Sequence, residues 1–232
     1  MIVPSLNTIA EDDFRLFCPP DVRYHVHRIR LRKENGVVTV DSLLRAHLEA
    51  AEEASFLKDM GPAAITFNCT GASVSHGAEG DERLAAHMKE VLGVPCSNTM
   101  LAIKRALRHA KARRIVHVCP FADKFSTDEK AALTAGGFEV LKSVGVNFVD
   151  AREAATMAPA TLAEHALRHA LPDMDAILLS CANVRAFEAV DTLERQLGVQ
   201  VITSNQAALW DVLRVAGWAG QIDGGGSLFH GE

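Results

Sequence analysis

The second half of the chain repeats the first. Residues 63–69 (AAITFNC) match residues 175–181 (DAILLSC), and the cysteines that end the two segments stand 112 positions apart, at 69 and 181. Two further matches keep the same order, the Ser-Asn pairs at 97–98 and 204–205 and the prolines Pro4 and Pro120. Three ordered matches at nearly the same spacing indicate two related structural units.

Short apolar runs alternate with amphipathic stretches in each unit. We expect strands at 1–4, 23–31, 63–68, 94–97, 114–119, 138–142, 175–180 and 199–203. Helical periodicity covers 40–59, 83–92, 102–112, 128–135, 161–170, 184–197 and 207–216. This pattern predicts an α/β fold with two pseudo-symmetric domains, each a four-stranded parallel sheet flanked by helices, over residues 1–98 and 99–207.

Composition narrows the classes of partner. The 232 residues are 48% hydrophobic and 23% charged, which is typical of a globular protein with a sizeable core. A net charge of −5 argues against a nucleic-acid partner, since phosphate binding needs concentrated positive charge. The sequence lacks an apolar run of 18 residues and a secretory leader, so no membrane partner is expected. Five widely spaced cysteines predict free thiols in a reducing cytoplasm.

Cys69 and Cys181 are the strongest candidates for chemistry. Each follows the third predicted strand of its unit, and ligands of open parallel sheets bind beyond the carboxyl ends of strands. Two units with those ends facing each other would place both thiols in one cleft, where backbone N–H groups favour a thiolate or a substrate carboxylate. A lone free cysteine is more often a small buried hydrophobe, and that reading is kept for Cys18, Cys96 and Cys119.

Other motifs contribute less. Zinc spacings, dinucleotide fingerprints and a serine-hydrolase elbow are missing from the sequence, so no metal and no cofactor are expected. Ser73, just beyond Cys69, is expected to donate a hydrogen bond to substrate. Asn7 follows the first strand at the same end of the sheet, where its amide could hold a carboxylate or cap the next helix.

Five segments together resemble the aspartate/glutamate racemase superfamily, in particular its branch of maleate cis-trans isomerases and arylmalonate decarboxylases. They are VPSLNT at 3–8, CTGAS at 69–73, Pro120-Phe121, LLSC at 178–181 and TSN at 203–205. The resemblance implies two α/β domains with facing active-site cysteines, no metal and no organic cofactor. It also implies that the segment 208–232 packs back on the first domain and that the protein is a homo-oligomer, a dimer or tetramer.

Within this branch, the decarboxylases have glycine where this chain has Cys69. Both cysteines therefore favour a cofactor-independent isomerase of a small carboxylic acid, most concretely one that converts maleate to fumarate. In that scheme the Cys69 thiolate adds to the double bond and Cys181 manages the proton. The resemblance implies a substrate site made of Asn7, Thr70, Gly71, Ser73, Phe121, Ala182 and Asn183.

Two departures keep alternatives open. The isomerases carry a tyrosine where this chain has Phe121, and an asparagine of the family is replaced in the region of Asp150. An amino-acid racemase would use the two cysteines as opposed acid and base. A decarboxylase of a disubstituted malonate is a further alternative, and a catalytically inactive carboxylate-binding protein is the alternative from another class.

Overall fold

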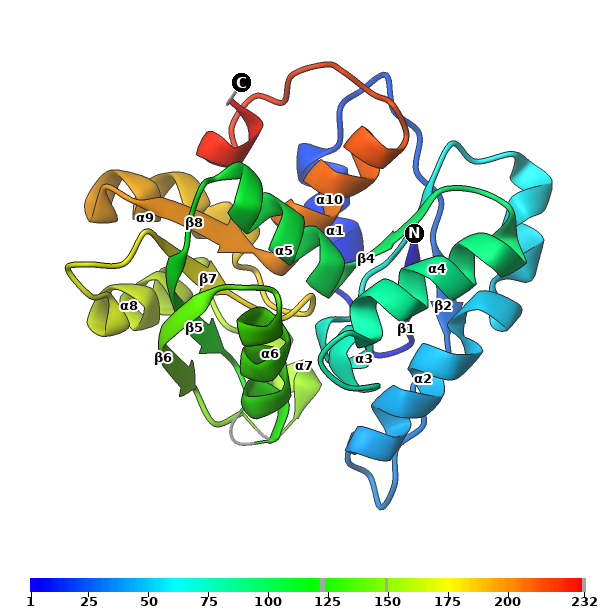
Figure 1. Cartoon of the computed structure of the whole chain (residues 1–232), viewed down its shortest axis with the longest axis horizontal. Helices are drawn as coiled ribbons and strands as arrows, with labels where there is room; N and C mark the ends of the chain where they lie inside the picture. The colour runs from blue at the N-terminus through cyan, green and yellow to red at the C-terminus, as the bar shows by residue number, and fades with distance from the viewer. Residues whose placement is uncertain (122–123, 149, 231–232) are drawn as a thin grey trace.

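The computed structural model describes residues 1–121, 124–148 and 150–230, and it contains two four-stranded, all-parallel sheets (Figure 1). The first has the order β2-β1-β3-β4, and the second has the equivalent order β6-β5-β7-β8. The predicted fold class and the predicted repeat are thus confirmed.

Each of the eight predicted strands is present. The first sheet comprises β1 (Ile2–Pro4), β2 (His27–Ile29), β3 (Ile65–Phe67) and β4 (Cys96–Asn98). The second comprises β5 (Arg114–Cys119), β6 (Glu139–Gly145), β7 (Ala176–Leu179) and β8 (Gln200–Thr203). The central strands β1, β3, β5 and β7 are almost wholly buried, as expected for parallel strands covered on both faces.

The helices differ from the predicted ranges mainly at their ends. They are α1 (Ala10–Phe17), α2 (Val40–Glu53), α3 (Thr70–Val74), α4 (Gly80–Leu92), α5 (Thr99–His109), α6 (Lys124–Ala135), α7 (Ala151–Ala155), α8 (Pro159–His169), α9 (Val190–Leu197) and α10 (Ser204–Val215), with 3-10 turns η1 (Ser55–Met60), η2 (Phe187–Ala189) and η3 (Ser227–Phe229). The predicted helix 40–59 divides into α2 and η1. The predicted helix 184–197 begins only at 190. The helices α1, α3 and α7 were not predicted from the sequence, and α3 and α7 have only five residues each, too few to show a helical period.

The repeated Ser-Asn pairs stand where a strand passes directly into a helix. Asn98 caps α5, its side chain accepting from the backbone N–H of Leu101. In the second unit Thr203 caps α10 and forms a capping box with Gln206. The two helices started in this way pack against each other, and α10 also contacts β3, β4 and α1 (Figure 1). This packing joins the two sheets through buried helix faces.

The end of the chain runs along the second unit. Glu194 on α9 accepts from the backbone N–H of Ser227 at 2.8 Å, and Gln206 donates to the carbonyl of Gly225 at 2.8 Å. The domain limits at 98 and 207 remain a prediction.

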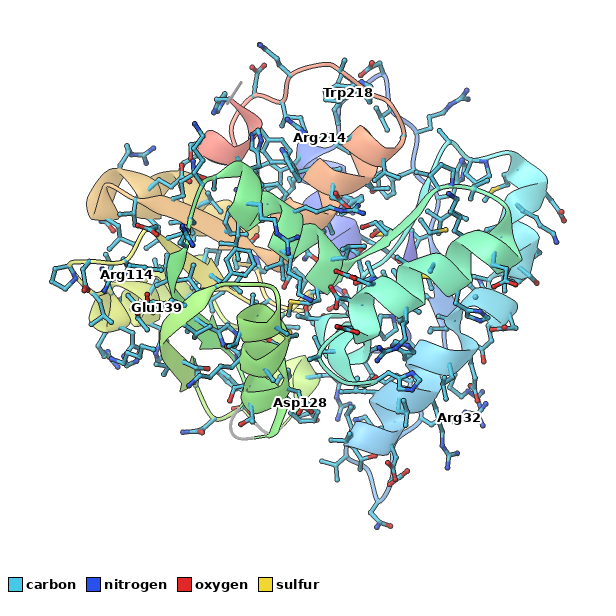
Figure 2. The ribbon with its side chains drawn as sticks, viewed as in Figure 1. Arg32, Arg114, Asp128, Glu139, Arg214 and Trp218 are labelled. Atoms are coloured by element: carbon cyan, nitrogen blue, oxygen red, sulfur yellow. The ribbon has the colours of Figure 1, made fainter. Side chains whose placement is uncertain are left out.

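Charged side chains mark the amino ends of β5 and β6. Arg114 forms an ion pair with Asp173 at 2.6 Å. It forms a second ion pair at 3.6 Å with Glu139, and both of these side chains are labelled in Figure 2. Among the residues described, no helix combines the length and apolar character that crossing a bilayer would require.

Candidate active site

A cavity of about 320 Å³ lies where the carboxyl ends of β1, β3, β5 and β7 converge. Both halves line it, with Cys69 from the first and Cys181 from the second. Most of its wall is apolar, formed by Pro4, Leu6, Leu31, Val37, Val38, Leu43, Phe121 and Phe125. A second cavity, of about 500 Å³, is larger, but it lies at the opposite ends of β1 and β3 and contains neither of these cysteines.

Cys69 lies between β3 and α3, directly before the first residue of α3. Its backbone is extended, with φ at −151°, and its side chain is 8% exposed. Burial raises the pKa of the thiol to about 12, and the nearby backbone N–H of Ala72 offsets part of that rise. Burial therefore favours the protonated form of the Cys69 thiol at neutral pH.

Cys181 follows β7 and has an unusual backbone. Its φ of +114° lies in a region that favours glycine, at a cost of about 1–3 kcal/mol for other residues. The backbone N–H of Cys181 donates to Ser204 Oγ at 2.9 Å, and that of Asn183 donates to Cys181 Sγ at 3.3 Å. Burial also raises the pKa of this thiol to about 12, and the charges of Glu129 and Cys69 add to the effect.

A pair of hydroxyl groups connects the two cysteine segments. Thr70, directly after Cys69, lies with its Oγ1 3.0 Å from Ser204 Oγ, the atom that also accepts from Cys181. Both hydroxyl side chains are buried. The link fixes the position of one cysteine segment relative to the other.

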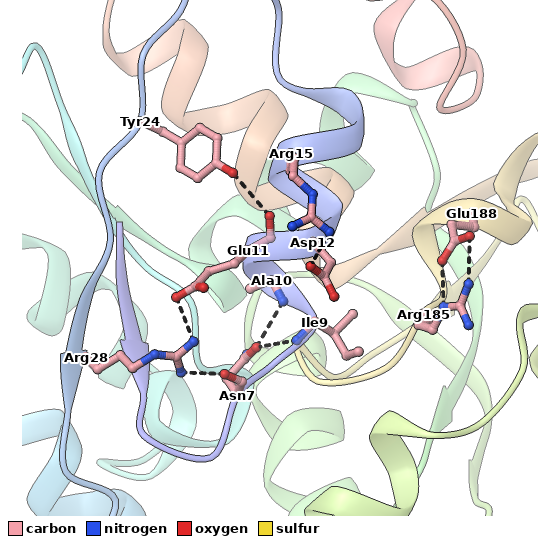
Figure 3. Close-up of polar contacts among 10 residues, drawn as sticks. All are labelled: Asn7, Ile9, Ala10, Glu11, Asp12, Arg15, Tyr24, Arg28, Arg185 and Glu188. Carbon is pink, nitrogen blue, oxygen red and sulfur yellow. Dashed lines mark hydrogen bonds and ion pairs between the residues drawn. The ribbon is translucent and has the colours of Figure 1, made fainter.

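Asn7 caps a helix and also holds the second cysteine segment. Figure 3 shows its Oδ1 accepting from the backbone N–H groups of Ile9 and Ala10, at 3.0 and 2.9 Å, at the start of α1. Its Nδ2 donates to the carbonyl of Ala182 at 2.8 Å. Arg28 donates in turn to the carbonyl of Asn7 (Figure 3). The capping alternative is confirmed, and Asn7 also lies on the cavity wall.

Ala182 and Asn183, which follow Cys181, form hydrogen bonds to both halves of the chain. The carbonyl of Ala182 accepts a second bond from Asn205 Nδ2 at 3.1 Å, and that amide also donates to Asp13 at 2.7 Å. Asn183 accepts from the backbone N–H of Thr8 at 2.9 Å and donates to the carbonyl of Ala151 at 2.8 Å. Burial raises the pKa of Asp13 to about 7. The segment 181–183 is thereby held by both halves of the chain.

The structure does not support the expected contact between Ser73 and substrate. Its hydroxyl donates to the carbonyl of Cys69 at 2.8 Å, the side chain is fully buried, and the residue is not on the cavity wall. A serine in a helix readily bonds the carbonyl four residues back, and this bond removes the hydroxyl from the site. Gly71 and Phe121 do line the cavity. Phe121 packs edge-on against Phe125, with 5.9 Å between the centroids of the two rings.

Four polar residues of the cavity were not foreseen from the sequence, the less buried Lys33 and Asn35 and the buried Asn68 and Glu129. Asn68 is fully buried, and neither of its amide atoms has a hydrogen-bond partner among the described residues. Glu129 on α6 is also buried on the cavity wall. Its position was visible in the sequence, because Phe125, Ala132 and Leu133 make the same face of that helix apolar.

The chain resembles two kinds of enzyme over almost its whole length. The family model for arylmalonate decarboxylase matches residues 20–229. Arylmalonate decarboxylase of Bordetella bronchiseptica is 30% identical, over 99% of this chain and 94% of its own. Maleate isomerase of Geobacillus stearothermophilus is 23% identical, over 100% of this chain and 96% of its own.

Solved structures show the same fold. Maleate isomerase of Pseudomonas putida S16, in complex with maleate, superposes with a TM-score of 0.89 at 23% identity, over 99% of this chain and 96% of its own. A liganded arylmalonate decarboxylase with glycine-to-cysteine and cysteine-to-serine changes gives 0.89 at 28% identity, over 99% and 97%. By the match of its sequence over nearly its full length, the chain belongs to the arylmalonate decarboxylase family.

Proposed function

We propose that this protein is a cofactor-independent isomerase that acts on a carboxylic acid through Cys69 and Cys181. The observation that carries the proposal is the placing of two thiols, from equivalent positions of the repeat, on one enclosed cavity. A pair of thiols can remove a proton at one side of a bound molecule and return one at another.

The cavity wall favours a substrate with an apolar group. Among the described residues that line the cavity, Lys33 carries the one positive charge, while Glu129 and Asp150 are acidic. A second carboxylate would therefore have few partners here, and Phe121 brings no hydroxyl group. We propose inversion at the carbon next to the carboxylate of an aryl- or alkyl-substituted acid as the reaction.

The proposed inversion has two proton transfers. The thiolate of one cysteine takes the α-proton, and the two electrons of the C–H bond move into the carboxylate to give an enediolate. Backbone N–H groups of the cysteine segments, around Thr70 and Asn183, and the amide of Asn68 would stabilise that charge. The thiol of the other cysteine then donates its proton to the opposite face, which leaves the product and a thiolate.

Cis-trans isomerisation of maleate is the second candidate. It is favoured by the maleate isomerases among the relatives, one of which, from Nocardia farcinica, was solved with a covalent succinylcysteine intermediate. Here Cys69 would add to the double bond and Lys33 would hold one carboxylate. Decarboxylation is supported by the relative of 30% identity, while amino-acid racemisation would use the same two thiols.

Proton NMR in D₂O distinguishes these reactions. The purified protein is incubated with maleate, each enantiomer of 2-phenylpropionate, phenylmalonate and a set of L- and D-amino acids. We expect exchange and inversion of 2-phenylpropionate by the native protein, with inversion lost on Cys69→Ala and on Cys181→Ala and kept in the control Cys18→Ala. Fumarate from maleate would favour the second candidate, and inversion that survives either active-site substitution would contradict the proposal.

The homo-oligomer implied by the resemblance stays a prediction. Sedimentation velocity of the full chain checks it, and we expect a species of two or four chains.

A further inference from the structure

A buried carboxylate on the cavity wall has no part in the two-cysteine scheme. The side chain of Glu129 is 5% exposed and lines the same cavity as Cys69 and Cys181. Its Oε2 accepts from Ser180 Oγ at 2.5 Å and lies 2.9 Å from His117 Nε2. Ser180 directly precedes Cys181, so this group of three side chains adjoins the second cysteine.

His117 on β5 contacts the carboxylate of Glu129 but does not itself line the cavity. Its ring is fully buried, and its other nitrogen, Nδ1, lies 2.9 Å from Ser143 Oγ on β6. Both ring nitrogens are therefore engaged, one with the carboxylate and one with a hydroxyl that can donate or accept. Such a cluster can take up one proton, on the imidazole or on the carboxyl group, without losing its hydrogen bonds.

The two thiols need an acceptor of this kind. Burial raises the pKa of each to about 12, and the negative charge of Glu129 raises both further. If a thiol released its proton to water, a second negative charge would be buried beside Glu129, which is costly in an apolar cavity. Transfer of the proton to Glu129 leaves the net charge of the cavity unchanged.

We propose that Glu129, backed by His117, is the internal acceptor of the thiol proton. The S–H bond of one cysteine breaks, its electron pair stays on sulfur, and an O–H bond forms on the carboxylate of Glu129. The reverse transfer regenerates the thiol. The inference rests on the proposed function for the need to form a thiolate at Cys69 or Cys181.

Other ionisable groups lie on the elements that pack against α6 and on the cavity wall. Lys104 on α5 is already paired with buried Asp81 at 2.9 Å. Lys142 on β6 lies near His169, whose pKa is lowered by burial and, to a smaller extent, by the charge of Lys142. Among the described residues, Cys119 on β5 lies close enough for the charge of Glu129 to raise the pKa of its thiol further after burial, and Lys33 and Asp150 line the same cavity.

Alkylation by iodoacetamide tests the proposal without any substrate. The rate is measured from about pH 7 to 9, and peptide mass mapping assigns the label to Cys69 or Cys181. Exchange of a proton inside the cavity does not depend on pH, so the native protein should react at a nearly constant rate. In Glu129→Gln the rate at pH 7 should fall at least about tenfold and rise about tenfold per pH unit, as for ionisation to water.

A purely electrostatic role predicts the opposite result. Glutamine removes a negative charge, so the thiols would ionise more easily and react faster than in the native protein. An equal or faster rate in Glu129→Gln overturns the proposal, and so does a native rate that rises tenfold per pH unit, which needs no variant to fold. Glu129→Asp should restore part of the rate, and the exposed Glu139→Gln should leave it unchanged. Because turnover is not measured, these outcomes are separate from failure of the isomerase proposal.

Discussion

The two segments that contain Cys69 and Cys181 follow equivalent strands but differ in local structure. In both halves the cysteine follows the strand that is third in chain order, and this strand is a central strand of its sheet. Cys69 has an extended backbone and leads directly into α3. Cys181 has a φ of +114°, and eight residues separate it from α9. The repeat therefore sets where the thiols lie, and the segments that follow give each thiol a different environment.

Two buried pairs of ionisable side chains differ in the same way. Lys104 and Asp81, 3% and 0% exposed, join α5 to α4 away from the cavity. His117 and Glu129 are equally buried, but Glu129 lies on the cavity wall. The pair away from the cavity connects two helices, whereas the pair on the cavity wall is the one to which we assign proton transfer.

The largest expected effect is the loss of stability when the pair of Lys104 and Asp81 is broken. Lys104→Ala leaves Asp81 charged and buried without its partner, and we expect a loss of about 3–5 kcal/mol in the free energy of unfolding. Urea unfolding measures the loss, with the exposed Lys130→Ala as the control. The double change Lys104→Met with Asp81→Asn should recover part of it. Alkylation of the active-site thiols in folded Lys104→Ala should be unchanged, and a changed rate would contradict the separation of the two pairs.

A second prediction concerns the support of the Cys181 segment. Because burial raises the pKa of Asp13 to about 7, the folded state binds a proton that the unfolded state releases above about pH 4. The contribution of Asp13 to the free energy of unfolding is fully present below about pH 4 and is lost as the pH rises through 7. Asp13→Asn should therefore be more stable than the native protein at pH 8, by about 2–4 kcal/mol, and much less so at pH 4. The neighbour Asp12→Asn is the control for thermal melts, and parallel pH curves for Asp13→Asn and the native protein would argue against this assignment.

Glycine at the two cysteine positions should have opposite effects. At 181 the positive φ favours glycine, so Cys181→Gly should be more stable than Cys181→Ala by about 1 kcal/mol. At 69 the extended backbone suits alanine, so Cys69→Gly should be less stable than Cys69→Ala by about 0.5–1 kcal/mol. Denaturant unfolding of the four variants gives both differences. If the difference in stability between the glycine and the alanine variant had the same sign at both positions, the two cysteine segments would not differ in backbone conformation as described.

An effect on binding alone is expected at the apolar wall of the cavity. Phe121→Tyr adds a phenol that can donate to a second carboxylate, and we expect maleate to bind about threefold to tenfold more tightly. Binding of 2-phenylpropionate should change by no more than about twofold. Calorimetric titration measures both, with Phe125→Tyr as the control on the same wall. Unchanged affinity for maleate would show that this position does not select between the two classes of acid.

Much of the fold could be predicted from the sequence. Runs such as AILL at 176–179 are apolar throughout because parallel strands are covered on both faces, and all eight strands were located. The short helices α3 and α7 could not be located, since five residues carry no clear period. Their formation depends on tertiary contacts, such as the bond between Asn183 and the carbonyl of Ala151.

The site was predictable only in part. The repeat identified Cys69 and Cys181, and it could do so because equivalent strands end at one cavity. The positive φ of Cys181 could not be foreseen, because a glycine normally marks that conformation. Glu129 was overlooked although it interrupts an apolar helix face, and its role depends on His117, twelve positions earlier and on another element.

The most direct test of the central claim is the enantiomer-resolved exchange of the α-proton in single-cysteine variants. Cys69→Ala and Cys181→Ala are each incubated with each enantiomer of 2-phenylpropionate in D₂O, and deuterium is followed by NMR and configuration by chiral chromatography. Two thiols on opposite faces predict that each variant exchanges one enantiomer with retention, that the two variants choose opposite enantiomers, and that neither racemises. Continued racemisation in either variant, or exchange of both enantiomers by one of them, would contradict a paired role for Cys69 and Cys181.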